Sequence, residues 1–166
     1  MRVTVLSRLA MAVFVYWVSL GAVAQPQALG WVEEGVLLPE NIEVKVKMDT
    51  GALTSSLDAK DIEPFKRAGK KWVRFKVALT DGKTHSEVIK ELERPVLRNV
   101  KLRGAGGIDH RPVVQMSICI GKHRYDEEFS LRNRSNMLYP VLLGRRTLEH
   151  LGPMDVSRTF TQKPQC

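Results

Sequence analysis

The stretch VKVKMDTGALTSS, Val44 to Ser56, contains the pattern that decides the fold. Apolar and charged residues alternate from Ile42 to Met48, which predicts a strand with one buried face. Asp49 stands where this alternation stops, and Thr50 and Gly51 follow it. A carboxylate in this place is either a turn residue that follows the strand or one half of a catalytic pair.

Turn signals separate further alternating segments along the chain. Val73 to Leu79 leads into Asp81-Gly82, a strong hairpin signal, and we expect the returning strand from Thr84 to Leu92. Two leucines at helical spacing precede Gly152, which predicts one short helix. Many short strands with closely spaced turns predict an all-β fold, as a small closed or sandwiched domain. Further strands are expected at 96–102, 113–120, 123–131 and 155–160.

The first 24 residues have the features of a secretory signal peptide. Two arginines precede an apolar run from Leu9 to Leu20, and Ala22 and Ala24 fit the A-x-A rule for cleavage. The run is shorter than the roughly 20 residues that a membrane-spanning helix needs. We expect export to the periplasm and a mature chain that starts at Gln25, with an uncleaved signal anchor as the alternative.

The mature part has a length that suits one domain with a single core. We expect an N-terminal extension at 25–36, the folded domain at 37–160 and a flexible tail at 161–166. The extension could be an extra strand, a dimer arm or a spacer. Cys119 and Cys166 could form a bridge in an oxidising compartment, but a buried thiol and a frayed terminus is the interpretation that we favour.

The chain is basic, with a formal net charge of +8 at pH 7. Part of this charge is concentrated in one short segment, which could contact an anionic polymer of the cell envelope or could simply be a solvated face. The residues concerned are Lys66, Arg67, Lys70 and Lys71.

Three motifs stand in a fixed order along the chain. Asp49-Thr50-Gly51-Ala52 follows a strand, Gly104-Ala105-Gly106-Gly107 lies between two strands, and Leu142-Leu143-Gly144-Arg145 precedes the short helix. In this order and approximate spacing they resemble the retropepsins. Within that superfamily the chain is similar to the bacterial group labelled ATP-dependent zinc proteases, through Met48 to Leu57, Arg111 to Val114 and the long run from Arg132 to Leu148.

The resemblance implies a small closed retropepsin-like β-barrel with one short C-terminal helix, and an exported aspartic endopeptidase that acts on peptides or proteins. In retropepsins an acid shortly after the D-T-G-A motif pairs with the arginine, whereas this chain has Leu53 there, so the partner of Arg145 is left open. The resemblance gives three sets of residues a role: catalytic Asp49, Thr50 and Gly51; a substrate-binding flap of Ala52, Gly104, Ala105, Gly106 and Gly107; and structural support from Leu143, Gly144 and Arg145.

Hydrolysis by carboxylates needs two of them close enough to share a proton. No aspartate other than Asp49 is followed by Thr-Gly or Ser-Gly, so the second carboxylate is expected from a second copy of the chain in a two-fold homodimer. Thr50 would then stiffen both loops across the dimer. Three hydroxyls, those of Thr54, Ser55 and Ser56, could either satisfy backbone groups of the loop or be solvated.

The zinc and the ATP of the group label are not expected here. No H-E-x-x-H motif occurs, and no G-x-x-x-x-G-K loop occurs either. We therefore expect no metal, no cofactor and no ATP. The four histidines, which stand singly and mostly beside turns, are His85, His110, His123 and His150.

Two other functions remain as alternatives. The first is a non-catalytic binding module of the same fold, for a peptide or an anionic polymer of the cell envelope. The second is a nucleic-acid-binding β-barrel, which has only the positive charge in its favour. The signal peptide argues against it, so no nucleic-acid partner is expected.

Overall fold

A computed structural model describes residues 27–166 of this chain apart from Lys83, Ala105 and Gly106. The expected signal peptide, with its cleavage after Ala24, lies outside the described residues. Within them the fold consists of eleven strands and one short helix. In chain order these are β1 (Leu29–Leu38), β2 (Ile42–Met48), β3 (Ser55–Asp58), β4 (Lys60–Arg67), β5 (Lys70–Thr80), β6 (Glu87–Pro95), β7 (Arg98–Gly104), β8 (Gly107–Ile120), β9 (His123–Arg132), β10 (Val141–Leu143), α1 (Arg145–Leu151) and β11 (Met154–Thr159).

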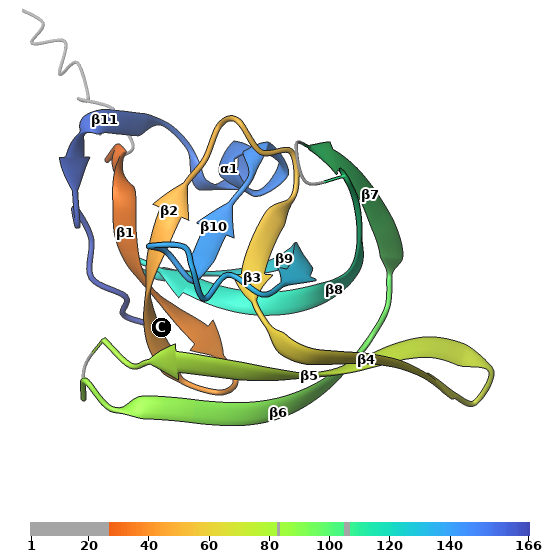
Figure 1. Cartoon of the computed structure of the whole chain (residues 1–166). Helices are drawn as coiled ribbons and strands as arrows, with labels where there is room; N and C mark the ends of the chain where they lie inside the picture. Colours follow the sequence, from red (N-terminus) through yellow and green to blue (C-terminus); the bar gives the residue numbers. More distant parts are fainter. Residues whose placement is uncertain (1–26, 83, 105–106) are drawn as a thin grey trace, which may run out of the picture.

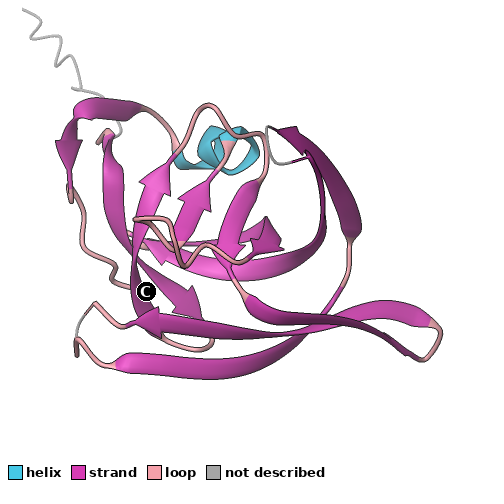
Figure 2. Cartoon of the chain, viewed as in Figure 1, coloured by secondary structure: helices cyan, strands magenta, loops and turns pink. Residues whose placement is uncertain are grey.

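The larger sheet curves until it closes on itself. Its strand order is β11-β1-β2-β10-β3-β9-β8-β7, and β1 also pairs with β8, with Val36 opposite Cys119 and Leu38 opposite Ser117. The strands β4, β5 and β6 form a separate sheet, which Figure 1 shows below the ring while α1 lies above it. Strands dominate the fold (Figure 2), which confirms the prediction of an all-β protein with one short helix.

Side chains from both sheets fill the core. On β2 the apolar residues Val44, Val46 and Met48 are buried while Lys45 between them is exposed, as the period-two alternation predicts. Phe75 on β5 lies in the same core and is fully buried. Each such side chain contributes about 1.5–3 kcal/mol through burial. The core therefore stabilises the end of β2, from which Asp49 projects.

The structure places a strand in the segment expected as an N-terminal extension, as one of the three alternatives has it, and holds the expected tail against that strand. β1 takes up most of the segment expected as an extension and pairs with β2, β8 and β11. Glu33 on β1 is fully buried, and its carboxylate accepts hydrogen bonds from the backbone N–H groups of Gly30, Thr161 and Gln162. Because the tail supplies two of these donors, it is fixed against β1.

The two cysteines form a disulfide, so the favoured interpretation of a buried thiol and a frayed terminus was wrong. Cys119 near the end of β8 is bonded to Cys166, with 6.0 Å between the Cα atoms. The backbone N–H of Gln165 also donates to the carbonyl of Gly121 at 2.7 Å. The last residues of the chain are thus held against the turn between β8 and β9.

The β5–β6 hairpin is confirmed, but its turn is longer than the Asp81-Gly82 pair predicts. β5 ends at Thr80 and β6 begins only at Glu87. The carboxylate of Asp81 accepts hydrogen bonds from the backbone N–H groups of Thr84 (2.8 Å) and Glu43 (3.0 Å). These bonds stabilise a wider loop that is anchored to the start of β2.

Candidate active site

Asp49 lies directly after β2, at the point where β2 runs beside β10. Its backbone N–H donates to the carbonyl of Leu143 at 2.8 Å. Its carboxylate accepts a hydrogen bond from the N–H of Gly51 at 2.9 Å and lies 3.5 Å from Nζ of Lys47. The side chain is 26% exposed, so the loop holds the carboxylate in a fixed place while solvent can still reach it.

Gly144 passes directly beneath this loop. A Cβ atom at this position would lie 2.8 Å from the carbonyl carbon of Thr54 and 2.9 Å from that of Leu53, closer than real Cβ atoms come to backbone. The residues after it bond to the loop, since the N–H of Arg145 donates to the carbonyl of Ala52 at 2.9 Å. A residue without a side chain is therefore required here for the two segments to touch.

The partner of Arg145, which the sequence left open, is the backbone of the Asp49 loop. Nη1 of Arg145 donates to the carbonyl of Thr50 at 2.7 Å and to that of Gly51 at 3.3 Å. These carbonyls take the place of an acidic side chain. Leu53 stands where retropepsins carry the acid, and Arg145 donates to these two carbonyls instead.

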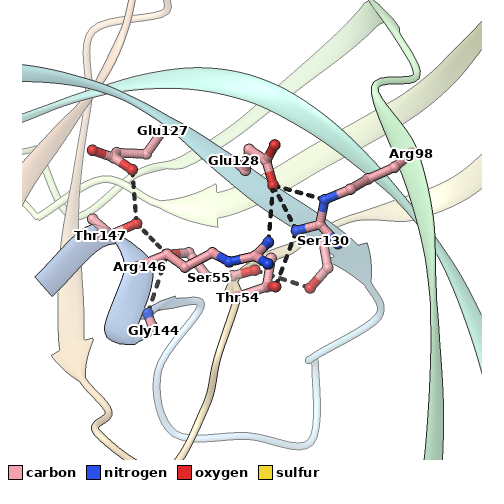
Figure 3. Close-up of polar contacts among 9 residues, drawn as sticks. All are labelled: Thr54, Ser55, Arg98, Glu127, Glu128, Ser130, Gly144, Arg146 and Thr147. Carbon is pink, nitrogen blue, oxygen red and sulfur yellow. Dashed lines mark hydrogen bonds and ion pairs between the residues drawn. The ribbon is translucent and has the colours of Figure 1, made fainter. Parts of the chain in front are cut away.

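Hydroxyl groups connect the loop to α1. Oγ of Ser55 lies 2.8 Å from Oγ1 of Thr147 and accepts the N–H of Gly144 at 3.1 Å. Thr147 in turn donates to Glu127 at 3.1 Å, and Ser130 donates to the carbonyl of Ser55 at 2.9 Å (Figure 3). Ser55 therefore satisfies backbone groups, as one of the two predicted alternatives has it.

The other two hydroxyls behave differently. Thr54 accepts a hydrogen bond from Arg98 at 3.2 Å. Oγ of Ser56 is buried and has no hydrogen-bond partner within the described part of the chain. Thr50 lies exposed in the loop.

The glycine-rich segment forms the end of the β7–β8 hairpin, with Gly104 opposite Gly107. Gly107 has a φ of +100°, in the left-handed region that favours glycine. Ala105 and Gly106, the two central residues of the expected flap, lie outside the described residues. The hairpin itself is the element from which a flap could be built.

Arg98 connects the base of this hairpin to the Asp49 loop, a contact that sequence reasoning missed. Its guanidinium donates to Glu128 at 2.5 Å as well as to Thr54, and Arg146 of α1 lies 3.7 Å from the same carboxylate (Figure 3). Glu128 thus joins the hairpin, the loop and the helix. Only the arginine and glutamate residue types were visible in the sequence, because Arg98 on β7 and Glu128 on β9 are brought together across the intervening strand β8.

Two further cations near Asp49 were also missed. Lys47 precedes Asp49 by two residues on β2. Its outward position follows from the alternation of β2, so the sequence alone could have indicated this neighbour. Arg134 is buried, and this burial, with the charge of Arg132, lowers the pKa of Arg134, against the opposing charges of Asp58 and Asp49. Lys47 therefore contacts the candidate carboxylate directly, and the charge of Arg134 acts on it more weakly.

Across residues 27–166, with the three gaps left aside, no group of three or more His, Cys, Asp or Glu residues is close enough to hold a metal ion. The same part of the chain contains no helix that is long and apolar enough to cross a membrane.

A family model described as RimB-like, retropepsin-like aspartic endopeptidase RimB, matches residues 28–165. The chain belongs to the RimB-like family. The fold also agrees with the crystal structure of Lpg0085, a protein of unknown function from Legionella pneumophila, at a TM-score of 0.70 and 31% identity over 84% of this chain and all of that one. The predicted resemblance to retropepsins is thereby confirmed.

Curated relatives of this RimB-like chain are named as ligases. It is 37% identical over 119 residues to a probable alpha-L-glutamate ligase of Shewanella halifaxensis, which covers 70% of this chain and 25% of the relative. A protein of the same name from Parasynechococcus marenigrum is 37% identical over 106 residues, 63% of this chain and 22% of the relative. The chain thus spans about a quarter of the length of these relatives.

Proposed function

We propose that this chain is an aspartic endopeptidase whose catalytic pair consists of Asp49 from each of two copies. The observation that carries the proposal is the Asp49 loop, where the reachable carboxylate accepts the N–H of Gly51 and the backbone N–H of Asp49 donates to Leu143. The chain supplies one such loop, and an isologous dimer brings two identical loops together at its two-fold axis.

In the proposed reaction a water molecule lies between the two carboxylates, which hold one proton between them. The ionised carboxylate takes a proton from the water as its oxygen attacks the peptide carbonyl carbon, and the protonated one donates to the carbonyl oxygen. When the C–N bond breaks, the amine leaves with the first proton, and a hydroxyl of the intermediate returns the second. The pair ends with one proton, as it began.

The support beneath the loop suits this chemistry, because catalytic groups act best when their surroundings already hold them in place. Arg145 fixes the carbonyls of Thr50 and Gly51, and Gly144 lets the helix start lie against the loop. Both copies of the loop would be stiffened in the same way. In this proposal the β7–β8 hairpin covers the substrate and excludes water from the site.

Exposed apolar side chains at the same end of the ring favour a partner there. Leu53, next to the candidate catalytic motif, is 50% exposed, and Val156 on β11 is 78% exposed. Figure 1 places β11 and the loop between β2 and β3 at one end of the ring. A second copy could cover both side chains while it brings its own Asp49 into place.

The substrate that we propose is a peptide with acidic side chains near the scissile bond. The ammonium group of Lys47 stands 3.5 Å from the Asp49 carboxylate and places a positive charge at the site. Relatives that share this sequence over part of their length are named probable alpha-L-glutamate ligases, which supports glutamate as the acidic residue of the proposed substrate. Replacement of Lys47 by Gln should then reduce cleavage of glutamate-rich peptides more than that of their glutamine counterparts.

We also propose that the protein acts in the periplasm after export. The Cys119–Cys166 disulfide supports this location, since such bonds persist in oxidising compartments. Detection of the protein in a periplasmic fraction, with Gln25 as its first residue, would test both the location and the cleavage site.

The experiment that tests the function is cleavage of an unfolded acidic protein by the chain from Gln25 onward, beside Asp49→Asn. Asp61→Asn is the matched control, because this exposed aspartate has a positive φ of 51° that asparagine also adopts readily. We expect Asp61→Asn to cleave and Asp49→Asn not to cleave, with activity per chain falling on dilution. Equal cleavage by both variants would refute the assignment.

A non-catalytic binding module is the second candidate. The ion pair between Lys47 and Asp49 favours it, because the lysine neutralises the carboxylate in the isolated chain. Absence of cleavage by the unmodified protein, together with peptide binding that survives Asp49→Asn, would support this alternative.

A further inference from the structure

A cavity lies away from Asp49, between the β4–β5 ribbon and the β7–β8 hairpin. Its volume is about 520 Å³, in the range of sites that hold small ligands or a few side chains. The hairpin contributes His110 and Pro112, which alternate along β8 with the buried Arg111 and therefore lie on the other face of the hairpin. The ribbon contributes most of the remaining wall.

Phe65 and Trp72 line this cavity together with Lys66 and Lys71, and because side chains alternate along a strand, the two rings lie on the opposite face of the ribbon from the two lysines. Phe65 on β4 and Trp72 on β5 are cross-strand neighbours whose ring centroids lie 6.3 Å apart. The guanidinium of Arg67 lies 4.5 Å from the centroid of Trp72 and is itself bound to Glu93. The two rings are thus held in place by neighbours whose charges are already compensated.

The positive charges of two lysines at the cavity are not compensated by an ion pair in this way. Lys66 and Lys71 are directly opposite each other on β4 and β5, are both exposed, and make no ion pair with any residue that the structure describes. Like charges in this position oppose strand pairing. Further along the same ribbon, by contrast, Lys76 pairs with Asp61 at 2.9 Å.

We propose that this cavity, the ribbon pocket, binds an acidic polypeptide segment through two of its features. Because successive side chains of an extended segment point to opposite faces, an apolar side chain packs on Phe65 and Trp72 while the carboxylates next to it neutralise Lys66 and Lys71 on the other face of the ribbon. β4 is an edge strand of its sheet, so an extended polypeptide can also pair with its outer backbone groups. This last feature favours a polypeptide over a lipid surface.

The ribbon pocket deepens the proposed function, on which its role as a substrate anchor rests. A substrate segment held there would lie on the outside of the hairpin, beyond the site around Asp49. The binding itself needs neither catalysis nor the Asp49 carboxylate. A test in the Asp49→Asn background therefore measures the pocket separately from the proposed activity.

The test is calorimetric titration of Asp49→Asn, from Gln25 onward, with a nine-residue peptide of glutamates around one central leucine. We expect binding that weakens with salt and becomes about tenfold weaker with Lys66→Gln and Lys71→Gln together. Lys45→Gln with Lys122→Gln is the control of equal charge, because both lysines are exposed and neither lines the pocket. This control should change the affinity less than about twofold.

Three results would overturn the proposal. One is no binding of the peptide, and another is equal weakening by the two double variants. The third is binding to vesicles of anionic phospholipid that depends on Lys66 and Lys71 while peptide binding does not, which would make the ribbon a membrane-surface contact.

Discussion

Replacement of Gly144 by alanine tests the support of the candidate active site most sharply. The added Cβ would lie within 2.9 Å of the backbone of Leu53 and Thr54, so the start of α1 and the Asp49 loop must move apart. Overpacking of this kind costs about 1–3 kcal/mol. The hydrogen bond from Arg145 to Ala52, now 2.9 Å, and that from Gly144 to Ser55, now 3.1 Å, would both lengthen.

Thermal unfolding followed by circular dichroism is the assay. We expect Gly144→Ala to lower the free energy of unfolding by about 2 kcal/mol and the melting temperature by about 5–10 °C. Gly82→Ala is the control, because its Cβ would meet first the flexible side chain of Glu43 at 3.1 Å. A Gly144→Ala melting temperature within about 1 °C of that of the unmodified protein would refute the close approach on which the site description depends.

Three further predictions concern the tail and the helix. Cys166→Ser should lower the free energy of unfolding by about 2–4 kcal/mol, since the disulfide closes a separation of 47 residues, and a reductant should then have no added effect on the melting temperature. Glu33→Gln should lower the free energy of unfolding by about 1–2 kcal/mol and speed amide exchange at Thr161. The reason is that an amide donor replaces one of the two carboxylate oxygens that accept the N–H groups of Thr161 and Gln162. The hydrogen bond between His150 and Glu127, and to a lesser extent the negative charge of Glu127, raise the pKa of His150 above the ordinary 6.5. The resulting stability is fully present below that value and lost as the pH rises through the raised pKa, so His150→Gln should destabilise at about pH 5.5 and not at about pH 8.5.

The strands that the sequence predicted well are those with one clean buried face. β2 and β5 alternate apolar and charged residues, and the structure buries the apolar set of each. Their pattern reports local geometry, because a period of two needs no knowledge of the partner strand. The short helix was also predicted from local signals, because two leucines at helical spacing precede Gly152, which ends the helix at a φ of +103°.

Other strands could not be predicted because their burial depends on distant residues. All four residues of β3 are buried, including the polar Ser55 and Asp58, so no alternation marks it. β1 places the charged Glu33 inside the protein, where donors from the tail satisfy it. These partners are more than a hundred residues away along the chain, and no local pattern reveals them.

The candidate site was predictable in its residue types and not in its contacts. The D-T-G motif and the Gly144-Arg145 pair indicated which segments meet, and the structure brings them together. That Arg145 binds two carbonyls could not be foreseen, because backbone acceptors carry no sequence signal. The roles of Lys47 and Arg98 likewise depend on distances that only the fold defines.

The shared catalytic pair is the central claim, and a mixing experiment tests it most directly. A fixed amount of unmodified protein is equilibrated with rising amounts of Asp49→Asn, and peptide cleavage is measured at each ratio. If each site needs Asp49 from both copies, mixed dimers have only one carboxylate and the activity falls steadily towards zero. Activity that stays constant at every ratio, from a protein that sediments as a monomer, would contradict the claim.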